Sequence, residues 1–372
     1  MLSTYLSYQL VTRDLGKSLG RVEDQVAVKR ETEYYLANIG KVKSAEEFVN
    51  DYRLFSYAMK AHGLEDMAYA KAFMLKALKE GIQETDSFAN KLTDKRYAEF
   101  VRSFNFEALG EEATTWVPAN HGVAERYLTR ATPPGGTPAE AYVKETAYYS
   151  DNIGHIKTID QFLHKDNERL LLYALQAFGL EASFGDKELL TKMLEGGTED
   201  PDSPANKHEN ESWAQFVKSF DFAGLGEEAT TYNRALRPSV DKYVRQKLEE
   251  DTGQQSEGVR LALYFQRKAG TITNAYEILA DKALAEVVRT YLGLPDAIAQ
   301  MDVDKQAKLI EDRLNLEDLQ DPAKVEKFIT RFTAMWDVNN SSASQSPVLA
   351  LFQPVEYGIS VDSLMAIATL KR

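Results

Sequence analysis

The sequence ETEYYLANIGK at residues 31–41 returns as ETAYYSDNIGH at residues 145–155, and the two copies open a long internal repeat. The repeat closes on GEEATT at residues 110–115, which returns unchanged at residues 226–231. A unit of roughly 100 residues has the length of a small domain, whereas solenoid repeats span only about 20–50 residues. The chain is therefore predicted to contain tandem domains.

A third, more divergent copy follows the first two. Gly270 and Gly293 stand 230 positions after Gly40 and Gly63. The apolar residues that follow Gly40 form the face of a helix, which Gly63 ends. We predict an all-α protein of three tandem, related helical-bundle domains, the third divergent, with an amphipathic helix at each end.

Local signals for helix ends recur in the copies. A capping box joins an N-cap residue to a Glu or Gln three positions later. The pairs here are Ser44 with Glu47, Thr158 with Gln161, and Asn274 with Glu277. We further expect the helix before Gly40 to end with that glycine in a left-handed conformation, and Gly63 to end the next helix.

The two ends of the chain carry apolar stripes. Positions separated alternately by four and three residues form a heptad seam in the first 28 residues. They are Met1, Tyr5, Tyr8, Thr12, Leu15, Leu19, Val22 and Val26. We predict one amphipathic helix there, which packs either on a partner protein or on the body of this chain.

Residues 348–372 form a second predicted amphipathic segment, at the other end of the chain. Together the two stripes give a predicted partner-binding set of Tyr5, Tyr8, Leu15, Leu19, Val22, Val361, Leu364, Met365 and Ala368. Apolar helix faces of this kind bind other helices or grooves in partner proteins. Self-association through the terminal helices is an alternative use of the same faces.

The breaks between these segments give a domain map. Pro and Gly interrupt residues 132–138, residues 251–256 form a polar break, and Ser and Asn dominate residues 339–346. The map comprises the N-terminal helix 1–28, repeat 1 at 29–116, a linker or connector helix at 117–144, repeat 2 at 145–232, a connector helix at 233–256, the divergent repeat 3 at 257–338, a tether at 339–347 and the C-terminal segment 348–372.

The composition excludes several classes of function. The net charge is −13, so the chain lacks the basic footprint of a nucleic-acid-binding protein. No cysteine is present, which removes disulfides, thiolate metal sites and a cysteine nucleophile. No cleaved signal peptide and no apolar run long enough for a membrane span are visible.

No motif predicts catalysis. The five histidines do not form helical metal-binding pairs, and the phosphate-binding glycine loops are missing. Asp200–Glu211 resembles a calcium loop, but it lacks the turn glycine, and its sister copy has Lys95 at the closing position. We therefore predict no catalytic residue, no cofactor and no metal, and we expect that the protein is not an enzyme.

Several motifs resemble a bacterial family of helical domains of unknown function. They are residues 2–10, Tyr34–Ser44, Ala61–Phe73, Asp86–Leu92 and Gly258–Phe265. Members of that family commonly carry tandem copies, and their genes often lie in flagellar clusters. The resemblance covers nearly the whole chain but names no activity, and the end of the chain does not match the terminal motif of flagellar rod or hook proteins.

This resemblance implies a non-enzymatic structural or assembly factor of the bacterial flagellum that acts through helical protein contacts. The alternative is a cytoplasmic helical scaffold or export chaperone for flagellar proteins. The protein would accordingly be flagellum-associated or cytoplasmic. Its expected partners are proteins, with flagellar components suspected, and neither nucleic acid nor a membrane.

Overall fold

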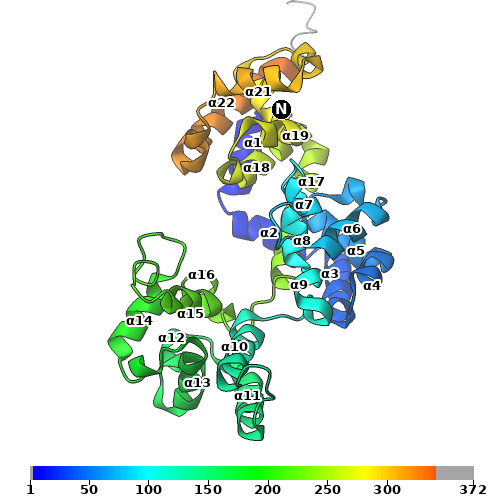
Figure 1. Cartoon of the computed structure of the whole chain (residues 1–372). Coiled ribbons are helices and arrows are strands. Elements are labelled where there is room, and N and C mark those ends of the chain that lie inside the picture. Colours follow the sequence, from blue (N-terminus) through cyan, green and yellow to red (C-terminus); the bar gives the residue numbers. More distant parts are fainter. Residues whose placement is uncertain (1–2, 341–372) are drawn as a thin grey trace, which may run out of the picture. The chain divides into compact units, whose positions relative to one another are not determined.

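The computed structural model describes residues 3–340 of the chain, and this part contains helices and turns but no strand (Figure 1). The predicted all-α class is confirmed. The chain divides into two compact units. One comprises Leu15–Glu250, and the other joins the N-terminal residues up to Asp14 to the residues that follow Glu250.

The unit Leu15–Glu250 holds two related bundles. The first contains α2 (Leu15–Glu23), α3 (Val26–Asn38), η1 (Ile39–Lys41), α4 (Ala45–Asn50), α5 (Tyr52–Ala61), η2 (Glu65–Met67), α6 (Lys71–Glu80), α7 (Phe88–Lys91), α8 (Arg96–Ser103), α9 (Phe106–Leu109) and η3 (Gly110–Glu112). The second contains η4 (Pro118–Gly122), α10 (Val123–Ala131), α11 (Glu140–Asn152), η5 (Ile153–His155), α12 (Ile159–Phe162), η6 (Lys165–Asn167), α13 (Glu168–Phe178), η7 (Glu181–Ser183), α14 (Lys187–Gly196), α15 (Ser212–Phe220), α16 (Phe222–Leu225) and η8 (Gly226–Glu228). Helix α17 (Arg237–Gln255) follows and runs to the unit boundary and beyond.

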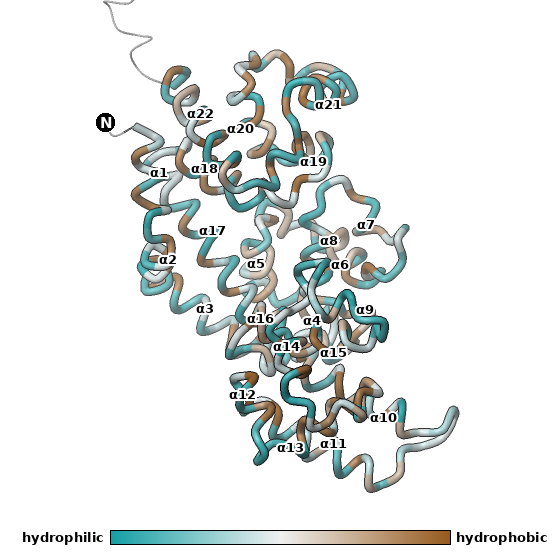
Figure 2. Tube along the Cα trace, turned by 90° about the vertical axis from the view of Figure 1, so that its left-hand side faces the viewer, coloured by the Kyte–Doolittle hydropathy of each residue, from teal (hydrophilic) through white to brown (hydrophobic). Residues whose placement is uncertain are grey.

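The other unit holds the third bundle. It contains α1 (Thr4–Thr12) together with α18 (Glu257–Lys268), η9 (Ala269–Thr271), α19 (Ala275–Ala280), α20 (Lys282–Leu292), η10 (Asp296–Gln300), α21 (Val303–Glu311), η11 (Leu316–Gln320) and α22 (Pro322–Asn340). Brown and teal segments alternate along α18 and α22 in Figure 2, as expected for amphipathic helices that bury one face.

The capping signals position the same helix in every bundle. The side chains of Ser44, Thr158 and Asn274 accept hydrogen bonds from the backbone N–H three residues later, at 3.1, 3.2 and 3.1 Å. The return contact goes one residue further back than in the usual box. The Glu47 carboxylate, for example, accepts from the backbone N–H of Lys43 at 2.8 Å. Each cap thereby fixes the chain that enters α4, α12 or α19.

Equivalent large side chains fill the three cores. Phe48, Phe100 and Phe104 are fully buried in the first bundle. Their counterparts are Phe162, Phe216 and Phe220 in the second bundle, and Ile278, Phe328 and Phe332 in the third. The repeated pattern therefore marks core positions, which explains why all three positions remain large and apolar in the divergent copy, although Ile278 replaces a phenylalanine.

The connecting helices are exchanged between the first two bundles. Helix α10 follows the first bundle but packs on the second, where the Tyr127 ring stacks on Tyr173 at 3.9 Å between centroids. Helix α17 follows the second bundle but packs on the first, where Tyr243 stacks on Tyr57 at 3.8 Å. Each bundle is thus completed by a helix from a connector. In the first bundle this helix is α17, which follows the whole second bundle along the chain.

Hydrogen bonds repeat this exchange. The buried hydroxyl of Tyr149 donates to the carbonyl of Ala119 at 2.6 Å, within the second bundle and its connector. The equivalent Tyr35 donates to the carbonyl of Ala235 at 2.7 Å, which belongs to the connector after the second bundle. Asn233 also donates to the carbonyl of Thr114 at 2.9 Å. The same contacts are therefore made twice by different parts of the chain.

Three expectations about helix boundaries were wrong. Residues 1–28 do not form one helix, because turns at Arg13-Asp14 and near Gln25 divide them among α1, α2 and the start of α3. The expected break at 251–256 is helical up to Gln255, since its polar residues are compatible with a helix, and only Ser256 is extended. Gly40 lies in a 3-10 turn and is not left-handed, whereas Gly63 is, with φ 68°. The Pro- and Gly-rich residues 132–138 are irregular, as predicted.

Candidate functional site

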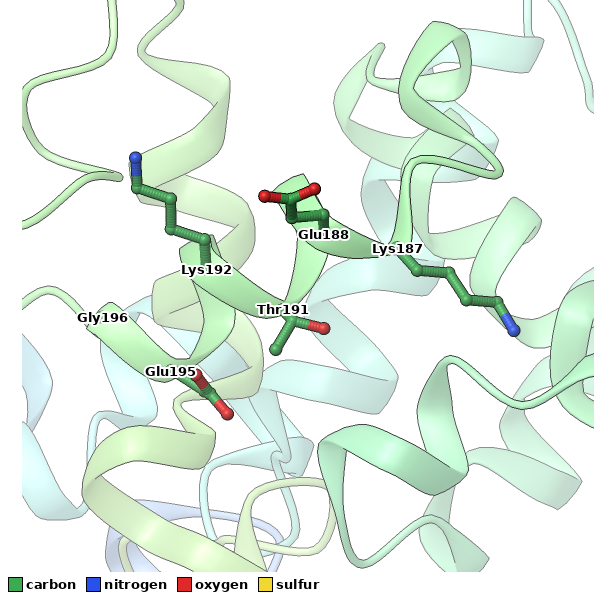
Figure 3. Close-up of a pocket in the computed structure, with 6 residues that line it drawn as sticks. All are labelled: Lys187, Glu188, Thr191, Lys192, Glu195 and Gly196. Carbon is green, nitrogen blue, oxygen red and sulfur yellow. The ribbon is translucent and has the colours of Figure 1, made fainter.

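No group of three metal-ligating side chains occurs between residues 3 and 340. An open depression on α14 is lined by the Lys187, Glu188, Lys192 and Glu195 side chains, but these point in different directions in Figure 3. General acid–base chemistry requires groups that converge on one reacting atom. This surface does not supply that arrangement.

A small cavity lies in the third bundle. It has a volume of about 30 Å³ and is lined by residues that include Leu279, Ile298 and Ile310. Ligand sites usually measure about 300–1,000 Å³. The cavity is a packing defect of this small bundle core, and it is too small to hold a substrate.

The loop that resembles a calcium site is held as a turn. The backbone N–H of Asp202 donates to the Asp200 carboxylate at 2.8 Å. The Asn206 side chain donates to the carbonyls of Thr198 and Asp200 at 3.0 and 2.8 Å. In the sister loop Asn90 makes the same pair of contacts with the carbonyls of residues 82 and 84. The duplicated asparagine therefore makes the same two hydrogen bonds in both loops.

Helix α1 occupies a defined seat on the third bundle. Figure 1 shows α1, in blue, beside α18 and α22, and Tyr8 belongs to the buried core of that bundle. Tyr8 is 1% exposed, and Tyr5 and Val11 pack against the same core. We define the α1 seat as the surface of α18 and α22 that receives these side chains.

Two carboxylates of α22 hold α1 by hydrogen bonds. Asp337 accepts from the backbone N–H of Thr4 at 3.0 Å and also from the Thr4 hydroxyl. Glu326 accepts from the hydroxyls of Tyr5 and Tyr8 at 3.1 and 3.2 Å, one at each carboxylate oxygen. Hydrogen bonds to charged groups are stronger than neutral ones. The contacts therefore fix both the direction and the rotation of α1.

A glycine allows α1 to approach closely. A Cβ atom on Gly258 would lie 2.8 Å from the Thr4 side chain and would overlap the ring of Trp336. Gly258 is buried in the first turn of α18. Because every other residue has a Cβ, only glycine lets Thr4 and Trp336 meet over this part of the helix.

The opposite face of α1 is apolar as well. Leu6 and Leu10 are 49% and 63% exposed, and they lie on one face because they are four residues apart. Val338, near the end of α22, is 68% exposed. Helix α1 thus has an inward aromatic face, which is seated, and an outward leucine face.

The predicted partner-binding residues fall into different units. Tyr5 and Tyr8 lie in the α1 seat, which agrees with the alternative that the seam packs on the protein's own body. Leu15 and Leu19 are half-buried on α2, and Val22 of the same helix is buried. The C-terminal members Val361, Leu364, Met365 and Ala368 lie outside the described residues. The heptad seam is therefore divided between two units and does not form one continuous stripe.

Burial raises the pKa of several tyrosines in the first two bundles. Burial raises the pKa of Tyr173 to about 12, and its hydroxyl donates a hydrogen bond to the Thr146 hydroxyl at 2.8 Å. Burial also raises the pKa of Tyr149 well above its ordinary value. These tyrosines remain neutral and serve as packing groups rather than as acids.

Histidines likewise have structural contacts. His62 is buried, and its ring packs against Phe100 in a T-shaped arrangement with 5.3 Å between the centroids. The His121 Nδ1 atom accepts from the backbone N–H of Val117 at 3.0 Å. The sister copy has Phe178 at the position of His62, and both side chains are buried.

Glu326, Asp337 and Gly258 were not singled out as site residues. Glu326 and Asp337 stand on an otherwise ordinary amphipathic helix, where an acidic residue normally faces solvent. Gly258 opens one of the segments that resemble the helical family, and its place in the first turn of a helix was the only available signal. Glycine within a helical pattern often has a packing reason, which here is the close approach of Thr4 and Trp336.

The family model described as "Protein of unknown function (DUF1217)" matches residues 61–167 and 177–325. The chain belongs to this family. The two matched segments are adjacent and each crosses a repeat boundary, so the family unit is offset from the repeat as it is read from the sequence. The family description names no activity.

The chain is also similar to a solved structure. Protein AGR_C_984 from Agrobacterium tumefaciens, a structural genomics crystal structure, shares 36% sequence identity with it. The match covers 91% of this chain and 97% of the other, with a TM-score of 0.53. No curated protein matches the chain. Among the described helices, none combines the length and the apolar character needed to cross a membrane.

Proposed function

We propose that the protein is a non-enzymatic structural or assembly factor of the bacterial flagellum that acts through helical protein contacts. The observation that carries this proposal is the two-sided α1. Its aromatic face is fixed on the third bundle, while Leu6 and Leu10 remain exposed on the other side. The flagellar context comes from the resemblance to a family whose genes often lie in flagellar clusters.

The architecture supports a role in binding rather than in catalysis. Three bundles built from one repeat multiply helical surface, and the divergence of the third copy lets one surface specialise. Paired leucines on a helix are a common anchor for a helical partner. A net charge of −13 adds long-range attraction toward basic protein surfaces.

The test is a pair of chromosomal substitutions at the leucine face. Leu6→Ser with Leu10→Ser should reduce swimming and the capture of flagellar neighbours by crosslinking, without loss of folded protein. Tyr69→Ser is the matched control, because Tyr69 is 80% exposed on another bundle. Normal motility and unchanged neighbours in the double-serine strain would contradict the proposal, provided that circular dichroism shows an intact fold.

A cytoplasmic scaffold or export chaperone is the second candidate. It is favoured by the seating of Tyr8 on the protein's own body, because a helix that is already docked is not free for assembly. Cell fractionation separates the two candidates. A chaperone stays out of purified basal bodies, whereas a structural component is recovered with them.

A further inference from the structure

Helix α1 is remote along the chain from the bundle that it completes. It ends at Thr12, and the next helix of its own bundle, α18, begins at Glu257. The whole unit Leu15–Glu250 lies between them. The strength of the intramolecular contact therefore depends on an effective concentration, and a second molecule can compete for the seat.

The α1 seat is selective for α1 itself. The seat presents the carboxylates of Glu326 and Asp337, and residues 3–13 supply hydroxyl and N–H donors but no acidic side chain. Gly258 leaves space for a small side chain at the position of Thr4. The segment whose chemistry fits the seat on every count is another copy of the same helix.

The first two bundles show that this repeat accepts a closing helix from elsewhere. Helix α17 supplies Tyr243 to the first bundle in the same way that α10 supplies Tyr127 to the second. At Gly63 and Gly179 the equivalent side chains of Gln246 and Arg130 lie within 4 Å of a Cβ position. Exchange of a closing helix is thus already part of the architecture within one chain.

We propose that α1 is exchanged between two copies of this chain, so that the third bundle of one copy receives α1 of its partner. The turn at Arg13-Asp14 is the hinge of this exchange, because the contacts between α1 and its seat are the same in both arrangements. The resulting assembly is a dimer when the exchange is mutual. This inference goes beyond the proposed function and does not require a flagellar partner.

Disulfide trapping tests the exchange in the full chain, which has no cysteine of its own. A tagged Thr4→Cys chain and a differently tagged Asp337→Cys chain are co-expressed, purified and mildly oxidised. A mixed disulfide that carries both tags is expected. The matched control replaces Thr4→Cys by Val26→Cys, since Val26 is 85% exposed and lies in α3. A mixed product no greater than in this control, with an internal disulfide in the double variant of one chain, would overturn the proposal.

The unmodified chain gives an independent answer if the cysteine variants fail to fold. Light scattering should show a mass that rises with concentration from 41.9 kDa toward twice that value. Deletion of residues 1–12 should abolish the rise, whereas Leu6→Ser with Leu10→Ser should retain it. A monomer at every concentration, or a dimer that survives the deletion, contradicts helix exchange. Because the serine variants test the flagellar role, failure of one proposal is distinguishable from failure of the other.

Discussion

The second and third bundles share one repeat but differ in how their closing helix is held. Helix α10 leads into its own bundle through residues 132–139, and its Tyr127 forms one end of a three-ring stack with Tyr173 and Tyr149. Helix α1 reaches α18 only through the intervening unit, and its tyrosines end on the carboxylate of Glu326. A short connection and an aromatic stack favour a stably packed α10. A long connection along the chain and hydrogen bonds to Glu326 allow α1 to dissociate from the third bundle.

The difference extends to the core. The third bundle has Phe265 and Val287 where the second has Tyr149 and Tyr173. Phe265 stacks on Phe328 at 4.3 Å between centroids, so its ring faces inward and makes no polar contact with a connector. The divergent copy has therefore replaced the tyrosine stack with packing inside the bundle. Its closing helix depends on α22 instead.

The largest expected effect comes from breaking the tyrosine stack. Tyr173→Ala removes the central ring and should lower the free energy of unfolding of the second bundle by about 3–5 kcal/mol. Urea unfolding followed by circular dichroism measures the loss. Tyr173→Phe is the control, because it keeps the ring. Equal losses in the two variants would show that packing of the ring is not what holds α10.

Tyr8→Ala should have a smaller and more local effect. The substitution empties the α1 seat at a position 1% exposed, but α18 and α22 retain their contacts with each other. We expect a loss of roughly 2–3 kcal/mol, below the usual range for a core aromatic because α1 can detach alone. Hydrogen exchange should rise in α1, α18 and α22 and stay unchanged in α13. A uniform increase would contradict separate closure of the third bundle.

The Tyr173 hydroxyl should make the second bundle sensitive to alkali. Its pKa is raised to about 12 by burial, with Glu145 and Tyr127 nearby adding to the rise. The folded state holds the proton more tightly than the unfolded state, so this stability is present below the ordinary pKa of 10.0 and is lost as pH rises toward 12. Near neutral pH, the free energy of unfolding of the wild type should exceed that of Tyr173→Phe by about 1 kcal/mol, because only the wild type has the hydrogen bond with Thr146. Unfolding measured at several alkaline pH values should show that this difference decreases as the pH rises. A difference that stays constant would contradict a raised pKa of Tyr173.

The smallest expected effect concerns acid. The Arg169 guanidinium, by hydrogen bonding, holds the pKa of Glu145 below its usual range, whereas Leu261 occupies the corresponding position in the third bundle. This stability is present above the ordinary carboxyl pKa and is lost as pH falls through the lowered folded value. Because exposed ion pairs contribute little, Glu145→Gln should slightly reduce the acid dependence in the second bundle only. Bundle-resolved hydrogen exchange at acidic pH measures it, and an equal change in the third bundle would refute it.

Local sequence signals determined a large part of the fold. The repeat unit, the helical class, the capping residues Ser44, Thr158 and Asn274, and the stop at Gly63 could all be read directly. The caps and the stop depend on contacts between residues a few positions apart, and the repeat is visible as self-similarity of the sequence. The exact ends were less certain: a seam with regular spacing predicted one helix over residues 1–28, although the chain turns at Arg13-Asp14.

Only the tertiary structure decided which bundle each connecting helix completes. The connectors carry equivalent tyrosines, Tyr127 and Tyr243, and the bundles offer them equivalent rings, so the pattern fits either pairing. The seat of α1 on α22 was hidden for the same reason, because Glu326 and Asp337 become specific only when Thr4 and Tyr8 lie beside them. Periodicity shows which face of a helix is apolar. The bundle on which that helix packs depends on contacts between distant segments, and in a repeated sequence several bundles offer equivalent contacts.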